Sequence, residues 1–323
     1  MSRLRTIATR GDTPVLAMSI ATGALVALLI ASFEYLADSV LLERLSHRPL
    51  WQIALAPAIG LLLATLILRW AGRGMGSATS DEFIRVYHER TPRLPLRDLP
   101  AKFLAGVATI GFGGALGLEG PSIYMGSTTG LAVHDRFRRW LRREDVRILL
   151  TAGAAAGVAA VFKAPATGVL FALEAPYRDD VTRRALIPSL LAAATSYVTY
   201  INIVGPDSVI PFLNDPESRL GLNLIDARLF TEDGLVWIHR DQLSALFTGV
   251  KASDVLGAIL VGILAGLGGR SMAWLVRWAK GISKQTNAVT RLLIGGSFLA
   301  VLAVAADALF GAPLTIGPGF TAM

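Results

Sequence analysis

One carboxylate, Glu119, stands in a stretch of small and flexible residues, GALGLEGPS, Gly114 to Ser122. Proline is favoured at the first position of a helix, because the N–H group that it lacks would be unpaired there. Pro121 therefore predicts that a helix begins at this position. The first N–H groups of such a helix, together with the positive end of its dipole, form a site for an anion.

The Glu119 carboxylate is itself an anion, so it can occupy this site and leave it when it is protonated or displaced. Gly117 and Gly120 allow the backbone to approach an ion closely. The pattern predicts a gate, in which a side chain competes with a mobile anion for the same N–H groups. The alternative is that Glu119 only caps a helix at a membrane surface. A carboxylate inside a membrane favours a functional role.

Long apolar runs must position this carboxylate. The chain has 323 residues, of which 53% are hydrophobic and 17% charged, whereas about 25% are charged in a typical soluble domain. The runs long enough to be candidate spans are Val15 to Ala37, Trp51 to Leu68, Ala185 to Val204, Val255 to Val276 and Leu292 to Phe320. About 20 apolar residues cross a bilayer core, and the runs lack the alternation of a β-barrel. The sequence predicts an all-α polytopic membrane protein rather than a large soluble core.

The net charge of +7 follows the membrane pattern and does not indicate a nucleic-acid partner. Basic residues lie at the ends of apolar runs, as the positive-inside rule predicts. Arg10 and Arg73 are expected to be cytoplasmic, as is the N-terminus, residues 1–13, and Glu43 to Arg48 to lie outside. We interpret the N-terminus as retained and not as a signal peptide. The chain has no cysteine, which excludes a disulfide framework and a thiolate metal site; we expect neither metal nor cofactor.

Several shorter apolar segments are predicted to be broken helices. They are Lys102 to Leu118, Pro121 to about Val133, Leu149 to Phe162 and Ala166 to Glu174. Such segments are tolerated at membrane depth where they are buried in protein or line a polar cavity, and in transporters they end at a binding site. Their many Gly and Ala residues favour close helix packing. Residues 205–253 are polar and turn-rich, which predicts an extramembrane loop.

At this point the sequence resembles a known family. GLEGP is similar to the G-(K/R)-E-G-P signature of the CLC chloride channels and chloride/proton antiporters. The resemblance continues through KFLAGVATIGFGGALGLEGPSIYMGSTTG, Lys102 to Gly130, and TAGAAAGVAAVFKAPATGVLFALE, Thr151 to Glu174. It implies tilted and broken helices in an inverted-repeat fold within the cell membrane. It also implies transport of chloride or a similar small anion by a homodimer, whose dimer surface includes Ala166 to Val204.

The resemblance implies roles for the residues around the gate. Glu119 corresponds to the gating glutamate, which also carries protons in the antiporters. Gly120, Pro121 and Ser122 open the helix whose N–H groups face the anion. Lys102 matches a basic residue near the pathway, with an electrostatic role at most.

An earlier anion motif of the family, G-S-G-I-P, is altered to GMGSATSDEF in this sequence. Ser77 is the leading counterpart of the serine that contacts the anion, although no proline follows it. Met75, Thr79 and Ser80 are the alternatives. A change of this serine is expected to alter selectivity among chloride, nitrate and fluoride.

A second departure concerns protons. Many antiporters of the family carry two adjacent glutamates after the second block, and the latter delivers protons from the cytoplasm. Here the pair is Glu174 and Ala175. Glu174 is a possible substitute in the proton path, although a structural carboxylate at a helix end is the favoured interpretation. The sequence thus leaves open whether the protein is a channel or an anion/proton antiporter.

The resemblance also suggests a division of the chain. Residues 14–204 are expected to form a first membrane repeat with the anion site, and residues 254–323 the start of a second. Leu314 to Met323 resembles the loop after the family's half-way point, so most of the second half is expected to be missing from this chain. A fragment is the leading interpretation, and a truncated gene or completion by a second chain are the alternatives.

Two other function classes compete with transport. A membrane-embedded enzyme would need catalytic groups, but the four histidines, His47, His88, His134 and His239, show no HExxH pattern or comparable ligand spacing. A non-transporting fragment or scaffold would bind a partner without flux. Helix N-termini at the site disfavour a cation transporter.

Overall fold

The computed structural model describes residues 13–73, 75–177, 183–205, 230–231, 234–235, 252–311, 313 and 315–317. It forms two compact units. The first contains Met1–Pro211 and Leu292–Met323, and the second contains Phe212–Arg291. The expected extramembrane loop, 205–253, lies for the most part outside the described residues, and so does the N-terminus up to residue 12.

All the regular secondary structure described in the first unit is helical. Its elements are α1 (Thr13–Glu34), the π-helical stretch η1 (Tyr35–Leu42), α2 (Glu43–Ser46), α3 (Leu50–Trp70), α4 (Ser80–His88), the 3-10 turn η2 (Leu96–Asp98), α5 (Leu99–Gly111), α6 (Glu119–Phe137), α7 (Asp145–Phe162), α8 (Pro165–Glu174), the 3-10 turn η3 (Arg183–Ala185), α9 (Leu186–Val204) and most of α12 (Ala288–Phe310). The second unit holds α11 (Ala252–Gln285) and a two-residue antiparallel pair, β1 (Phe230–Thr231) with β2 (Gly234–Leu235). The all-α expectation is therefore confirmed, apart from this short hairpin.

Six helices among the described residues are long and apolar enough to cross a membrane. Five of them correspond to the five expected runs. The sixth, Asp145–Phe162, corrects the expectation of a fourteen-residue broken segment, because its first turn is polar. The run predicted to reach Phe320 was too long: α12 ends at Phe310, and Gly311 follows with φ +72°.

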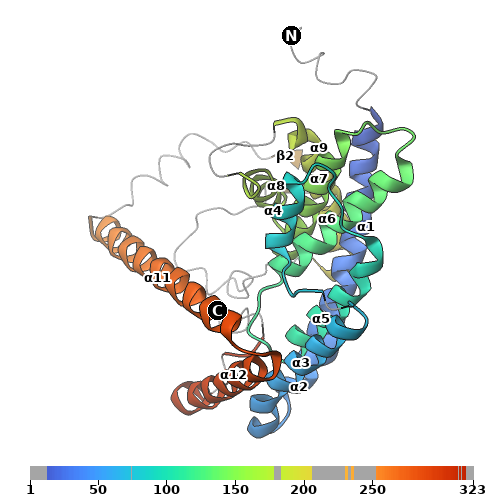
Figure 1. Ribbon diagram of the computed structural model, residues 1–323. Coiled ribbons are helices and arrows are strands. Elements are labelled where there is room, and N and C mark those ends of the chain that lie inside the picture. Colours follow the sequence, from blue (N-terminus) through green and yellow to red (C-terminus); the bar gives the residue numbers. More distant parts are fainter. Residues whose placement is uncertain are drawn as a thin grey trace. The chain divides into compact units, whose positions relative to one another are not determined.

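Small residues bring the central helices into backbone contact. Helices α1, α6 and α7 lie side by side in the first unit (Figure 1). A Cβ atom on Gly126 of α6 would collide with the carbonyl group of Gly153 of α7, and one on Gly153 would collide with Gly126 in return. A Cβ atom on Gly157 of α7 would likewise collide with the Ser122 carbonyl group of α6. The Gly and Ala runs of the sequence thus serve close helix packing, as expected.

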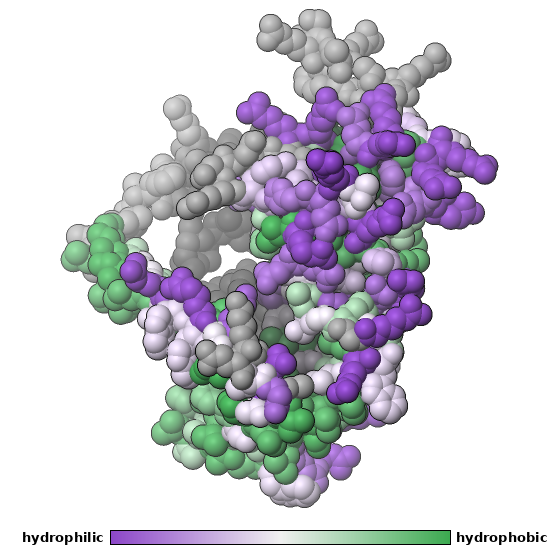
Figure 2. All heavy atoms as spheres, viewed as in Figure 1, coloured by the Kyte–Doolittle hydropathy of each residue, from purple (hydrophilic) through white to green (hydrophobic). Residues whose placement is uncertain are grey.

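Two parts of the first unit present polar surface on the face drawn in Figure 2. Figure 2 shows hydrophilic residues over α4 and over the loop that joins α6 to α7. This loop carries the exposed residues Arg138, Arg139 and Arg143, and Trp140, which stacks on Phe137 with ring centroids 5.7 Å apart. Charged and aromatic residues at the end of an apolar helix are typical of a membrane interface.

Candidate functional site

Helix α6 begins at Glu119, two residues before the predicted start at Pro121. Its first helical bond runs from Ser122 N–H to the Leu118 carbonyl oxygen, at 3.0 Å. The N–H groups of Glu119 and Gly120 precede that bond, and Pro121 has no N–H group to offer. The first turn of a helix leaves such groups available to other acceptors. The prediction of the start was wrong because proline is tolerated throughout the first turn, not only at its first position.

The Glu119 side chain folds back over the loop that precedes α6. A Cβ atom on Gly117 would overlap the Glu119 carboxylate. Gly117 itself is exposed, and Glu119 is half-buried. The loop leaves α5 through Gly113, whose φ of +83° is a left-handed conformation that favours glycine. The glycines therefore give the carboxylate its space, beside the first N–H groups of its own helix.

Helix α4 begins against the same point. A Cβ atom on Gly120 would lie 2.5 Å from Thr79 Oγ1 and 3.6 Å from Ser80 Oγ. The N–H groups of Glu82 and Phe83 close the first turn of α4 on the Thr79 carbonyl oxygen, at 3.1 and 3.2 Å. The N-termini of α4 and α6 thus lie together, at a place that we call the α4–α6 junction. Two positive dipole ends and two hydroxyl groups at one place favour an anion over a cation.

The four candidates for the anion-contacting residue of the earlier motif lie at different places in the structure. Thr79 and Ser80, the alternatives left open by the sequence, supply the contact to Gly120. Ser77, the leading candidate, is exposed in the 75–79 stretch, which forms neither helix nor strand. Met75 donates its N–H group to the Gly72 carbonyl oxygen at 3.0 Å and belongs to the turn after α3.

Ser122 is fully buried, and its hydroxyl group donates to the Glu119 carbonyl oxygen at 2.8 Å. This bond holds the first turn of α6 closed. Pro121 lies next to Gly106 of α5, with its Cγ 3.9 Å from where a Cβ on that glycine would be. Both residues therefore shape the start of α6 and pack it against α5.

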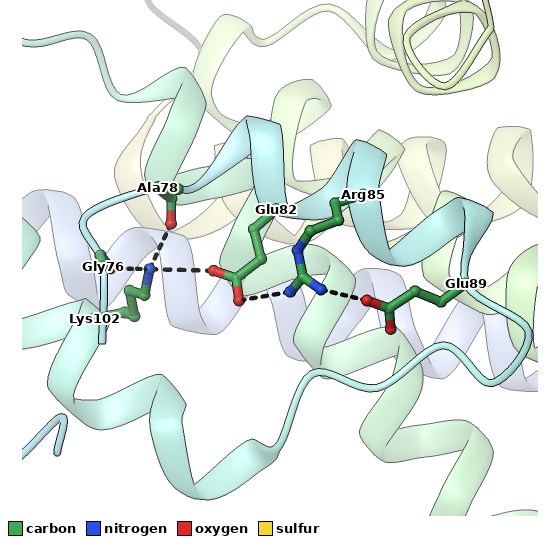
Figure 3. A network of polar contacts seen from close by, with 6 residues as sticks. All are labelled: Gly76, Ala78, Glu82, Arg85, Glu89 and Lys102. Carbon is green, nitrogen blue, oxygen red and sulfur yellow. Dashed lines mark hydrogen bonds and ion pairs between the residues drawn. The ribbon is translucent and has the colours of Figure 1, made fainter. Parts of the chain in front are cut away.

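Lys102 of α5 is close to this site and buried. Its ammonium group donates to the backbone carbonyl oxygens of Gly76 and Ala78, and to the Glu82 carboxylate at 3.2 Å (Figure 3). The family resemblance implied an electrostatic role at most for Lys102. Its bonds to backbone carbonyl groups could not be predicted from residue types, because every residue carries a carbonyl group.

The structure does not join Glu174 to the gate. Glu174 is the exposed last residue of α8. Gly157 of α7 contacts Ser122 of α6, and Ala155 and Ala159 of α7 contact Gly168 of α8, so α7 packs against both helices. The neighbouring residues after α8 are tied to α4. The hydroxyl groups of Tyr87 and Tyr177 lie 2.8 Å apart, and His88 Nε2 donates to the Pro176 carbonyl oxygen at 2.6 Å.

One polar pair was missed by the sequence analysis. The Tyr200 hydroxyl group of α9 donates to the Glu34 carboxylate of α1. Glu34 and Asp38 line a cavity of about 520 Å³ between the two helices. The only signal in the sequence was that Glu34 interrupts an apolar run.

Comparison with protein families gives a match to the voltage gated chloride channel family over residues 59–321. Among curated proteins, the H(+)/Cl(-) exchange transporter ClcA of Vibrio cholerae is 34% identical over 232 residues, 68% of this chain and 48% of that protein. ClcA of Yersinia pseudotuberculosis is 30% identical over 285 residues, 81% of this chain and 58% of that protein. The chain thus spans about half the length of these curated relatives.

Two solved structures share the fold. One is a slow cyanobacterial Cl-/H+ antiporter, with a TM-score of 0.68, 23% identity and coverage of 95% of this chain and 66% of that chain. The other is a CLC-type fluoride/proton antiporter, with a TM-score of 0.66, 23% identity and coverage of 94% and 67%. The tilted and broken helices expected from the resemblance are confirmed by this likeness.

Proposed function

Because this chain belongs to the voltage-gated chloride channel family, a family of membrane transport proteins and not of enzymes, we propose that it forms a transmembrane pathway for chloride or a similar small anion, gated by Glu119. It is a multi-pass protein of the cell membrane, with six helices in its described part that can span the bilayer. The observation that carries the proposal is the meeting of the α4 and α6 N-termini beside the Glu119 carboxylate.

In the proposed mechanism, the anion takes the place that the carboxylate holds in the closed state. The N–H groups of Glu119 and Gly120 and the α4 and α6 dipoles attract it. Pro121 and Ser122 hold the first turn of α6, and Gly117 gives the carboxylate room to move. A proton on Glu119 removes the charge that competes with the anion, so protonation opens the gate.

Ser77 is proposed to contact the anion as it moves along the exposed 75–79 stretch, before it reaches Thr79 and Ser80. A hydroxyl group can donate one hydrogen bond to an anion without bringing a charge of its own. The relative placement of these hydroxyl groups would then set the preference among chloride, fluoride and nitrate.

The exchangers among the relatives suggest that anion movement is coupled to protons. Ala175 has no titratable group, so in this chain Glu174 is the proposed proton donor on the α8 side. Uncoupled, channel-like conduction is the competing form of the same function. The homodimer is proposed to form through Ala166–Val204, where Phe171 and Leu190 expose apolar side chains.

The test is efflux of chloride from loaded liposomes that carry the purified chain, with the external pH recorded in the same run. In the parent chain, chloride efflux with uphill proton movement would indicate an antiporter, and efflux without it a channel. Glu119→Gln has no titratable group at this position, so its efflux is expected to lose the pH dependence of the parent, and any proton coupling is expected to be lost.

Glu43→Gln is the matched control, because Glu43 is exposed at the start of α2 and away from the α4–α6 junction. It is expected to keep the parent's pH dependence. A Glu119→Gln chain that behaves like the control would show that the gate is assigned to the wrong residue. Calorimetric titration with chloride detects binding without transport, and a chain that neither binds nor transports chloride would overturn the proposed function.

A further inference from the structure

The ammonium group of Lys102 is the most deeply placed charge near the α4–α6 junction. Only 6% of its side chain is exposed. A lysine ammonium has three N–H donors and no acceptor. All three are matched: by the Gly76 carbonyl oxygen at 2.7 Å, by the Ala78 carbonyl oxygen, and by Glu82 Oε2 at 3.2 Å (Figure 3).

This arrangement has an energetic consequence for the loop. A buried charge is strongly unfavourable unless it is paired and hydrogen-bonded. Residues 75–79 form neither helix nor strand, so their carbonyl groups need partners outside a regular ladder. Lys102 supplies partners for two of them. The charge and the loop therefore stabilise each other, and the buried ammonium group would lose two of its three acceptors if the loop moved.

The same side chain joins three helices to the loop. Lys102 belongs to α5, Glu82 lies in the first turn of α4, and Tyr124 of α6 presents its ring 4.9 Å from the ammonium nitrogen. A cation over an aromatic ring is attracted by the ring's electrons. The loop ends at Thr79, whose Oγ1 lies against Gly120 of α6. A shift of the loop therefore shifts the Thr79 hydroxyl group relative to the gate.

We infer that Lys102 is a positioning residue, which fixes the 75–79 loop and so sets the distance between the Thr79 hydroxyl group and the N-terminus of α6. Through this distance it determines discrimination between small anions of different size. The effect on discrimination rests on the function proposed above, whereas the fixing of the loop does not.

The network in Figure 3 also offers a matched control. Arg85 bridges Glu82 at 3.4 Å and pairs with Glu89, but 60% of its side chain is exposed. An exposed ion pair contributes little to stability. Arg85→Gln therefore removes a charge from the same network without removing the bonds to the loop, whereas Lys102→Met removes those bonds and keeps a side chain of similar length.

The first experiment measures the loop directly. The chain has no cysteine, so Ala78→Cys, at an exposed position, gives a unique attachment point for a nitroxide spin label. In the full chain in liposomes, the label is expected to be immobilised in the parent and in Arg85→Gln. Lys102→Met is expected to give the narrow lines of a mobile label. An equally immobile label in folded Lys102→Met would overturn the inference.

A second variant keeps the test valid if Lys102→Met does not fold. Glu82→Gln retains an oxygen that accepts from the ammonium group but loses the opposite charge. It is expected to mobilise the label partly, more than Arg85→Gln does. A label as immobile in Glu82→Gln as in Arg85→Gln would count against Lys102 as the fixing residue.

The second experiment compares efflux of chloride, nitrate and fluoride. Lys102→Met is expected to change the chloride-to-nitrate rate ratio by on the order of threefold, because small displacements at a binding site have large effects on rate. A role in folding alone would lower all rates together and leave the ratio at the parent value, which would overturn the effect on discrimination. If the parent neither binds nor carries an anion, the proposed function and the effect on discrimination are both overturned, while the label mobility still decides whether Lys102 fixes the loop.

Discussion

The α6–α7 crossing and helix α11 are both rich in glycine, but their glycines have opposite surroundings. At the crossing, a Cβ atom on Gly126, Gly130, Gly153 or Gly157 would collide with the backbone of the facing helix. In α11, six glycines have no described heavy atom within 4 Å of such a position: Gly257, Gly262, Gly266, Gly268, Gly269 and Gly281.

The difference shows that glycine content alone does not identify a packing surface. At the crossing, the residues next to these glycines are buried, and among them Ala152, Ala154 and Ala156 are fully buried. In α11 the described apolar side chains, such as Leu260 and Trp274, are exposed. The same substitution, glycine to alanine, therefore has a different expected effect in each region.

The largest effect is expected for Gly153→Ala. The added methyl group meets backbone atoms of Gly126, which cannot rotate away as a side chain can. Overpacking of this kind costs about 3 kcal/mol, more than the gain of about 1 kcal/mol in helix propensity. Fluorescence-detected size exclusion in detergent should show loss of most of the monodisperse peak. A peak of parental height and thermal midpoint would contradict the close α6–α7 contact.

An intermediate effect is expected for Gly120→Ala at the α4–α6 junction. The new methyl group would lie 2.5 Å from Thr79 Oγ1, a side-chain atom that can rotate. We expect a loss of about 1 kcal/mol, seen as a thermal midpoint lower by about 2 °C. Chloride efflux should fall more than stability does, because the Thr79 hydroxyl group is displaced from the α6 N-terminus. Equal efflux by the variant and the parent, per folded protein, would show that the contact between Gly120 and Thr79 does not affect transport.

The smallest effect is expected for Gly266→Ala in α11. Its methyl group enters open space among the described residues, so only helix propensity acts, with a gain of about 0.5–1 kcal/mol. The thermal midpoint should rise slightly or stay unchanged. A fall comparable to that of Gly153→Ala would show that α11 packs closely on a surface beyond the described residues, and the contrast between the two regions would disappear.

Hydropathy predicted the long helices well, and its errors have physical causes. Helix α7 was predicted too short because it begins with a polar turn, in which the Asp145 carboxylate accepts from the Arg142 N–H group at 2.7 Å. Helix α12 was predicted too long because its apolar run continues past Gly311, where the left-handed backbone ends the helix. The π-helical stretch Tyr35–Leu42 gave no signal, since apolar content does not reveal the hydrogen-bond register.

The sequence predicted the motif at the start of α6, but it did not predict which other segments pack against that motif. Spacing around Pro121 and the two glycines located the start of α6 to within two residues. That α4 begins against Gly120 depends on tertiary packing, so the sequence left Thr79 and Ser80 only as alternatives to Ser77. Lys102 was underestimated for the same reason, because two of its three acceptors are backbone carbonyl groups.

The backbone contact between α6 and α7 also bears on motion. No layer of side chains separates the helices at Gly126 and Gly153, so α6 cannot slide along α7 without driving carbonyl groups into the opposite backbone. The donors at the start of α6 therefore form a stationary frame. In the proposed mechanism, opening would then involve only the Glu119 side chain and the loop that leaves Gly113. Rotation of a side chain takes picoseconds to nanoseconds, whereas a helix shift takes microseconds to milliseconds, so the proposed gate would open without a rearrangement of the fold.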